Sequence, residues 1–362
     1  MTSSEVHVGG HVTLLFSIHD EDHLPRSQGS RGAGLCLDAG VTVRATATHR
    51  DRPPDLAGVQ PGPRLDLTPA PVEVHVTDAT GVAWPDGEAL YHAVVDDLRT
   101  VRRLSPSTAV SMDVTLDLPV SQGFGMSGAG LLAAARAVLE ANGTPDDAYA
   151  ARVAHRLERT QRGGLGDVLA IHAGGMALRR QPGAPGVVGF AEGVPVDVPC
   201  LLVWQPDEAR HTSAYIDHPD WKRSITSAGE AALAPLCEGP WTGDRWTDLL
   251  EAAEDFATNS GIAAEPERAA LLGALRSSLE AAGMAGDWAV RLCMLGVSAV
   301  VIPSSADASQ RTSQAMQDAL ASTLSAHGYA AASVVAGPSR DGDGGAVDPE
   351  AGVDPVEGQD AA

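Results

Sequence analysis

Residues 119–130 read PVSQGFGMSGAG, and the apolar run LLAAARAVLEA follows at once over residues 131–141. This pattern predicts a glycine-rich loop that leads into the N-terminus of a buried helix. Glycines let the backbone approach a bulky anion, and the free N–H groups of a helix N-terminus point toward it. A nucleotide phosphate is the common occupant, and the Ser127 hydroxyl is placed to join a Mg²⁺ shell that the phosphates complete. The alternative is a glycine turn before an alanine-rich helix, without a ligand.

The loop differs from the two best-known phosphate motifs. A Walker A motif carries a lysine after its last glycine, and the only lysine of this chain is Lys222, far downstream. A Rossmann fingerprint needs G-x-G-x-x-G between a strand and a helix, with an acidic residue about 20 positions later, and this loop lacks that arrangement.

The composition limits the classes of partner. The chain has 362 residues, is 44% hydrophobic, and carries 47 acidic against 25 basic residues for a net charge of −22. The length suits two domains with a proper core. Nucleic acid and anionic membranes are excluded as partners, because phosphate backbones need a positive surface. So acidic a chain suggests the salt-rich cytoplasm of a halophilic archaeon, although GC-rich coding would also explain the shortage of lysine.

The cysteines and the N-terminus indicate a cytoplasmic protein. Cys36, Cys200, Cys237 and Cys293 are widely spaced, as reduced core cysteines usually are, and show no zinc spacing. The first residues, MTSSEVHVGG, have neither the basic nor the apolar region of a signal peptide. No apolar stretch reaches membrane-spanning length.

The order of the expected elements predicts an α+β protein with two lobes and a ligand in the cleft between them. The GSRGAG stretch at residues 29–34 is expected to form a glycine turn, and Thr144 to cap a helix whose first residue is Pro145. Between residue 204 and about residue 328 one strand is expected among helices, and the acidic segment 336–362 is expected to be disordered. The strands are expected at residues 11–19, 35–49, 72–76, 113–118, 198–204 and 297–303, and early helices at 86–103 and 144–161.

Candidate catalytic residues follow the loop. Asp167, in GGLGD, is either a cap for the next segment or a buried carboxylate that accepts a proton from a hydroxyl nucleophile. His155 and Glu158 share a helix face. That face is either solvated and paired with arginines, or it places Glu158 on Mg²⁺ and His155 on a substrate oxygen.

Two further segments offer substrate contacts. Arg179 follows the Gly174–Gly175 pair and is either a surface charge or a two-pronged donor to a carboxylate. Ser30 and Arg31, in GSRGAG, belong either to a simple turn or to a segment that presents N–H groups and a hydroxyl to a small polar substrate.

The loop at residues 119–130 resembles the ATP loop of the GHMP kinases (galactose, homoserine, mevalonate and phosphomevalonate kinases), which has the form P-x-x-x-G-L-G-S-S-A. Ser127 matches its second serine, which that family uses near Mg²⁺. Asp167 and Glu158 fall where the mevalonate-kinase branch carries its aspartate base and a metal-binding carboxylate, and residues 293–302 resemble a degenerate third motif. The ATP-binding residues that this resemblance implies are Gly123, Phe124, Gly125, Met126, Ser127, Gly128 and Ala129.

The N-terminal third is similar to the archaeal pantoate kinase branch of that family. Residues 9–22, GGHVTLLFSIHDED, resemble its P-x-H-V-T-x-F-F opening, and GSRGAG at residues 29–34 matches a second motif. The resemblance implies a ribosomal-S5-domain-2-like lobe over residues 1–180 with the ATP loop, a ferredoxin-like lobe over 181–335, and the tail.

The resemblance also implies phosphorylation of pantoate by ATP and Mg²⁺, a step toward coenzyme A. Asp167 would be the base, Ser127 and Glu158 the metal ligands, and Ser30, Arg31, His155 and Arg179 the substrate contacts. The alternatives are another kinase of the family, acting on homoserine, mevalonate or a sugar acid, and a nucleotide-binding protein without catalysis. Among oligomers, a homodimer would be the commonest assembly.

Overall fold

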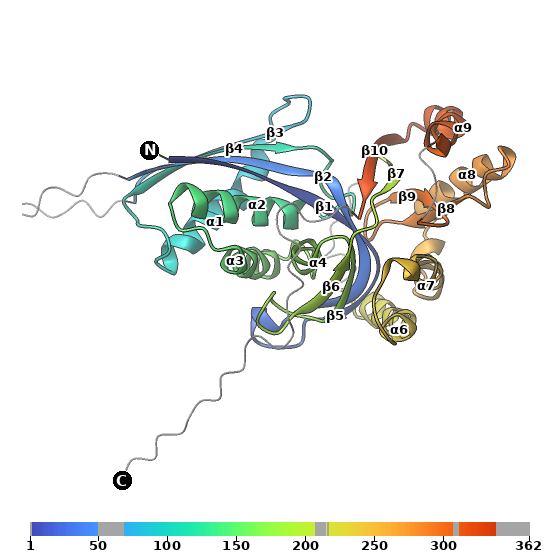
Figure 1. Ribbon diagram of the computed structural model, residues 1–362, viewed down its shortest axis with the longest axis horizontal. Coiled ribbons are helices and arrows are strands. Elements are labelled where there is room, and N and C mark those ends of the chain that lie inside the picture. The colour runs from blue at the N-terminus through green and yellow to red at the C-terminus, as the bar shows by residue number, and fades with distance from the viewer. Residues whose placement is uncertain (1, 50–68, 207–214, 216, 307–310, 338–362) are drawn as a thin grey trace, which may run out of the picture.

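A large curved sheet forms one half of the molecule (Figure 1). The computed structural model describes residues 2–49, 69–206, 215, 217–306 and 311–337. The long strand β2 pairs with β1 along one edge and, along the other, in turn with β5, β10 and β4. Because one strand carries all these pairings, it brings distant segments together. The strands of this sheet are β1 (Thr2–His19), β2 (Gly29–His49), β3 (Val72–Asp78), β4 (Thr108–Leu116), β5 (Met176–Gln181) and β6 (Phe190–Val194).

A second sheet lies at the other end of the molecule. Its strands run in the order β10, β7, β9, β8, and Ala336 of β10 opposite Leu37 of β2 is the one pairing recorded between the two sheets. The expectation of one strand between residue 204 and about residue 328 was wrong, because β8 accompanies β9 there, and β10 follows beyond that range. β8 has five residues and contains Arg291, and β10 is rich in alanine, which favours helices over strands, so neither gives a strong strand signal. The strands are β7 (Val198–Trp204), β8 (Trp288–Leu292), β9 (Ser298–Pro303) and β10 (Ala330–Ala336).

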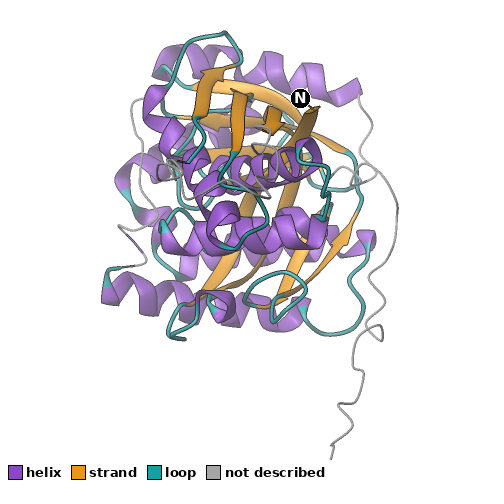
Figure 2. Cartoon of the chain, turned by 90° about the vertical axis from the view of Figure 1, so that its left-hand side faces the viewer, coloured by secondary structure: helices purple, strands orange, loops and turns teal. Residues whose placement is uncertain are grey.

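Helices cover both sheets, as Figures 1 and 2 show. The alanine-rich α2 packs on β1, β2 and α3, and α6 packs on β1 and α7. Among the described helices, none combines the length and the apolar character that crossing a bilayer requires. The helices are α1 (Glu88–Thr100), α2 (Met126–Ala141), α3 (Asp147–Thr160), α4 (Asp167–Ala173), α6 (Pro219–Leu236), α7 (Trp246–Asn259), α8 (Pro266–Ala281) and α9 (Arg311–His327).

The predicted α+β class is confirmed, and some local expectations were wrong. The GSRGAG stretch is not a turn but the first part of β2, where its glycines allow close strand contacts. The N-cap of α3 is Asp146, whose side chain accepts a hydrogen bond from Tyr149 N at 2.9 Å, rather than Thr144. The lobe boundaries at residues 180 and 335 stay predictions, and residues 338–362 of the predicted tail lie outside the described residues.

A close helix–strand contact joins α6 to β1. A Cβ placed on Gly229 of α6 would lie 2.0 Å from Phe16 O, whereas one on Gly273 of α8 would meet nothing within 4 Å. We expect Gly229→Ala to lower the free energy of unfolding by about 1–3 kcal/mol through overpacking. Gly273→Ala should raise it by up to about 1 kcal/mol, because alanine favours helices. Denaturant unfolding measures both, and equal shifts in the two variants would contradict this contact.

Candidate active site

The predicted loop is present after β4, and the predicted helix that follows it is α2. The backbone adopts left-handed conformations at Gly123 (φ +79°) and Gly125 (φ +66°), which glycine tolerates best. α2 begins at Met126, and a hydrogen bond of 3.0 Å from Ala129 N to Gly125 O closes its first turn. The N–H groups of residues 126–128 precede that bond, so the helix offers them no partner of its own. The local structure is therefore one that binds anions through backbone N–H groups.

The loop is fixed from two directions. On the β1 side, Phe124 O accepts a hydrogen bond of 2.9 Å from His11 N. On the side of the second sheet, a Cβ placed on Gly123 would lie only 2.9 Å from Met294 O. The loop is thus held between the N-terminal strand and the segment that precedes β9.

The GGLGD turn faces this loop. A Cβ placed on Gly128 would lie 3.1 Å from Asp167 Cβ and 3.4 Å from Glu158 Oε1. One placed on Gly163 would lie 3.9 Å from Ser127 Cβ. The start of α2, the end of α3 and the start of α4 therefore meet around one small space, and the candidates Ser127, Glu158 and Asp167 border it.

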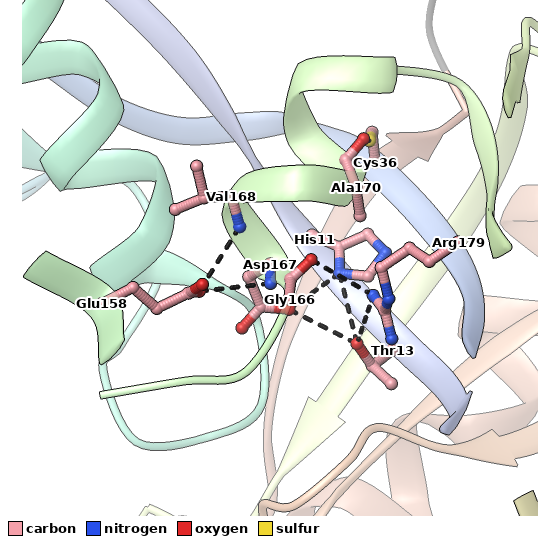
Figure 3. A network of polar contacts seen from close by, with 9 residues as sticks. All are labelled: His11, Thr13, Cys36, Glu158, Gly166, Asp167, Val168, Ala170 and Arg179. Atoms are coloured by element: carbon pink, nitrogen blue, oxygen red, sulfur yellow. Dashed lines mark hydrogen bonds and ion pairs between the residues drawn. The ribbon is translucent and has the colours of Figure 1, made fainter. Parts of the chain in front are cut away.

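Glu158 holds the start of α4. Its side chain is 1% exposed, so the alternative of a solvated helix face is wrong for this residue. Its Oε1 accepts hydrogen bonds from Asp167 N at 3.2 Å and Val168 N at 3.3 Å, as Figure 3 shows. Its Oε2 has no hydrogen-bond partner and lies 3.9 Å from His155 Nδ1. The carboxyl group thus orients Asp167 with one oxygen and leaves the other available.

The chemistry of Glu158 fits a cation. Burial, and then the negative charge of Asp167, raises the pKa of Glu158 to about 8. A divalent cation would remove this penalty and use the unpartnered oxygen, and hydroxyl and carboxylate oxygens are ligands that Mg²⁺ accepts. Within the described ranges no group of three His, Cys, Asp or Glu side chains could hold a metal alone. An ion beside Ser127 and Glu158 would therefore take further ligands from a bound phosphate.

Asp167 lies at the centre of a polar network (Figure 3). His11 Nδ1 is 2.9 Å from Asp167 Oδ1, and Thr13 Oγ1 donates to the same oxygen at 3.3 Å. His11 is completely buried, whereas the side chain of Asp167 is 27% exposed. The carboxylate is therefore held from the protein side and open on the other.

The pKa of Asp167 shifts in the opposite direction from that of Glu158. Burial alone would raise the pKa of Asp167, but the hydrogen bond with His11 and the positive charge of Arg179 lower it below its ordinary value. Burial lowers the pKa of His11, so near neutral pH the imidazole is uncharged and the contact suits a proton on Nδ1. Asp167 is consequently ionised at a pH where Glu158 holds a proton, which separates the roles of the two acids.

Arg179 of β5 is a buried cation without an acidic partner. Its side chain is 1% exposed, so the alternative of a surface charge is wrong. Its Nη1 makes only long contacts, 3.4 Å to Thr13 Oγ1 and 3.5 Å to Gly166 O, and Nε is unpartnered. No ion pair joins it to a carboxylate in the described part of the chain. Because a buried unpaired charge is unfavourable, this guanidinium indicates an anion that arrives with a ligand.

A small pocket, partly open to solvent, lies between Asp167 and Arg179. One part of its lining is polar and includes Asp167 and Arg179, and another part is apolar. The lining residues are Thr13, Phe16, Ser30, Gly164, Leu165, Gly166, Asp167, Arg179, Met294 and Leu295.

The predicted substrate contacts separate into two groups. Ser30 and Arg179 line the pocket, but Arg31 does not. Arg31 forms an ion pair with Glu230 of α6, because successive residues of a strand point to opposite faces. His155 is buried outside the lining residues, 3.2 Å from Pro25 O, and burial lowers its pKa to about 4.

Several known proteins are similar to this chain in sequence. A family model for the N-terminal domain of GHMP kinases matches residues 90–175. A pantoate kinase of Methanospirillum hungatei is 27% identical over 278 residues, which span 75% of this chain and 81% of that protein. A pantoate kinase of Thermococcus kodakarensis is 30% identical over 261 residues, 70% of this chain and 75% of that protein. This chain belongs to the pantoate kinase family.

A solved structure has a fold similar to that of this chain. A solved structure described as a phosphotransferase related to the CoA biosynthesis pathway aligns with a TM-score of 0.69 and 23% identity. The alignment covers 94% of this chain and 97% of that one. The two-sheet architecture is thus that of the GHMP kinases, and the chain is an ATP-dependent small-molecule kinase by family.

The structure adds site residues that the sequence analysis did not name. His11 and Thr13 bond Asp167, and Met294 and Leu295 line the pocket. Both pairs had a signal, since His11 and Thr13 are alternate positions of the GHVT stretch, and Met294 and Leu295 lie in residues 293–302, which resemble the degenerate third motif. Nothing in the sequence alone showed that Asp167 is the partner of His11 and Thr13.

The raised pKa of Glu158 predicts a pH dependence of stability. The folded protein holds this proton with a pKa of about 8, against 4.5 for a free carboxyl. The resulting stabilisation is complete below pH 4.5 and is lost as the pH rises through 8. His155 has a lowered pKa of about 4, so it makes the free energy of unfolding fall as the pH decreases below 6.5 and has no effect above that pH.

Between pH 6.5 and 8, without metal or nucleotide, the free energy of unfolding should therefore fall in the wild type relative to Glu158→Gln. Denaturant unfolding at a series of pH values measures the difference. Parallel curves for the two proteins would show that Glu158 is ionised at neutral pH.

Proposed function

We propose that the protein transfers the γ-phosphoryl group of ATP to the 4-hydroxyl of pantoate. The products are ADP and 4-phosphopantoate, on the route to coenzyme A. The observation that carries the proposal is the buried guanidinium of Arg179, unpaired with any described carboxylate, in the same pocket as the ionised Asp167. A substrate with a carboxylate at one end and a hydroxyl at the other matches this pair, and pantoate has both.

The substrate is held by its polar groups. Its carboxylate accepts hydrogen bonds from Arg179, for which a guanidinium is the best-suited donor. Ser30 lies beside Arg179, since both crowd the same face of Gly166, and its hydroxyl supplies a further polar contact. Arg31 and His155 do not contact the substrate in this proposal, because both lie outside the pocket. Arg31 forms an ion pair with Glu230, and His155 lies beside Glu158.

ATP is held by its phosphates at the loop of residues 123–129. Backbone N–H groups at the start of α2 donate to phosphate oxygens, so this acidic chain needs no lysine there. Ser127 and Glu158 would hold Mg²⁺, which would supply positive charge to neutralise the transferring phosphoryl group. A cation held there would favour the ionised form of Glu158 over the protonated form that burial otherwise favours.

Asp167 acts on the acceptor hydroxyl. The hydroxyl oxygen forms a bond to the γ-phosphorus while the bond from that phosphorus to the bridging oxygen of ADP breaks. Asp167 orients this hydroxyl for in-line attack and accepts its proton. His11 and Thr13 orient the carboxylate for this step.

The direct test is ADP release from Mg-ATP with pantoate, homoserine, mevalonate or no acceptor. The assay contains high KCl, because we further propose that this acidic protein works in the saline cytoplasm of a halophilic archaeon. We also propose that the protein is a homodimer. Pantoate-dependent turnover with formation of 4-phosphopantoate supports the proposal. Turnover only with another acceptor, or ATP binding without any turnover, would overturn it.

Removal of the Asp167 carboxylate should abolish proton acceptance while leaving the phosphate loop intact. We expect Asp167→Asn to lower kcat about 10²-fold or more, with little change in nucleotide affinity. Steady-state kinetics and nucleotide titration measure the two effects. A kcat near that of the wild type would remove Asp167 from the reaction.

Removal of the Arg179 charge should weaken substrate binding. We expect Arg179→Met to raise KM for pantoate about 10²-fold, as loss of a buried charged donor does. Arg180→Met is the matched control, because Arg180 is the next residue and its Nη1 donates to Cys237 O at 2.7 Å. A similar KM in both variants would place the carboxylate elsewhere.

The contact between His11 and Asp167 predicts a shift of the acid limb of kcat/KM. His11→Leu removes the hydrogen bond that lowers the pKa of Asp167, so this pKa should rise. Activity at low pH should then be lost at a correspondingly higher pH. His11→Asn, which keeps a donor near Nδ1, should shift the limb less. Identical pH profiles in all three proteins would contradict the contact.

A further inference from the structure

The segment between β8 and β9 forms an apolar part of the pocket wall. Met294 and Leu295 line the pocket together with Phe16 and Leu165, and all four belong to the hydrophobic core cluster. The polar groups of the pocket belong to β1, β2, β5 and the start of α4. Binding a carboxylate and activating a hydroxyl require only those polar groups, so the apolar wall needs a separate explanation.

The backbone of this wall is held firmly. Arg268 of α8 is completely buried and donates from Nε to Gly296 O at 2.9 Å, with a second bond to Leu295 O. Met294 N donates to Thr13 O of β1 at 3.0 Å. The apolar residues are thus fixed to the same strand that carries a partner of Asp167, and so to the reaction centre.

The substrate supplies a matching group. In pantoate, the carbon between the carbinol carbon next to the carboxylate and the carbon that bears the 4-hydroxyl carries two methyl groups. When Arg179 holds one end of the molecule and Asp167 the other, this carbon lies in the middle of the pocket. Two methyl groups there need an apolar surface, because burial against carbon is what makes them favourable.

We propose that Met294 and Leu295 form the surface that selects the two methyl groups of the substrate. This inference rests on the proposed function and adds the basis of its specificity. The segment that closes the pocket from the second sheet thereby distinguishes the branched acid from unbranched hydroxy acids, which Arg179 and Asp167 alone would accept.

The test compares two acceptors, pantoate and 2,4-dihydroxybutanoate, which lacks only the two methyl groups. The enzymes are the wild type, Leu295→Ala, Met294→Ala, and the milder Leu295→Val. Val297→Ala is the matched control, because Val297 is a buried residue of the same segment that does not line the pocket. The quantity measured is the ratio of kcat/KM for pantoate to that for the unbranched acid.

We expect the wild type to prefer pantoate by at least about tenfold, as apolar pockets do for added methyl groups. Leu295→Ala and Met294→Ala should each reduce the ratio at least about fivefold through slower use of pantoate, while turnover of the unbranched acid persists. Leu295→Val should lie between, and Val297→Ala should keep the wild-type ratio.

Two results would overturn the inference. One is a wild type that uses both acids equally well, and the other is a ratio that stays unchanged in every lining variant while turnover of the unbranched acid shows that they are folded. In both cases pantoate turnover by the wild type would leave the proposed function standing. A wild type that binds ATP and phosphorylates neither acid would remove the proposed function and this inference together.

Discussion

The guanidinium of Arg179 is 1% exposed, and no described carboxylate forms an ion pair with it. Keeping such a charge buried is unfavourable unless the surroundings compensate. The carboxylates of Asp167 and Glu158 compensate only in part, because each raises the pKa of this guanidinium but burial has the larger effect and lowers it overall. The rest of the site follows from this balance. One acid stays ionised, the other takes a proton, and the pocket beside the cation requires an anionic ligand.

Several parts of the site could be predicted because they depend on local sequence. The conformation of the loop at residues 119–130 follows from its own residues, because glycines that adopt left-handed conformations lead into an alanine-rich helix. Asp167 could be singled out for the same reason, because a glycine turn places it at the start of a helix. The spacing of His155 and Glu158 correctly predicted a shared helix face, but the spacing could not tell whether that face was buried.

Other parts depend on contacts between distant segments. Ser30 and Arg31 are neighbours in sequence, yet β-strand alternation sends one to the pocket and the other to Glu230, more than 190 residues away along the chain. The partnership of His11 with Asp167 arises only when β1 lies beside α4. The wall at Met294 and Leu295 depends on Arg268, a residue with no motif around it. Such contacts are set by tertiary packing, so one sequence without its fold does not reveal them.

The claim that the Arg179 site takes the carboxylate of the substrate can be tested without any mutation. Isothermal titration of the wild type, in the presence of a non-hydrolysable ATP analogue, would compare pantoate with its neutral primary amide. The account predicts that the amide binds about 10²-fold more weakly, because it cannot accept charge-assisted hydrogen bonds from the buried guanidinium. Equal affinities for the two molecules would contradict it.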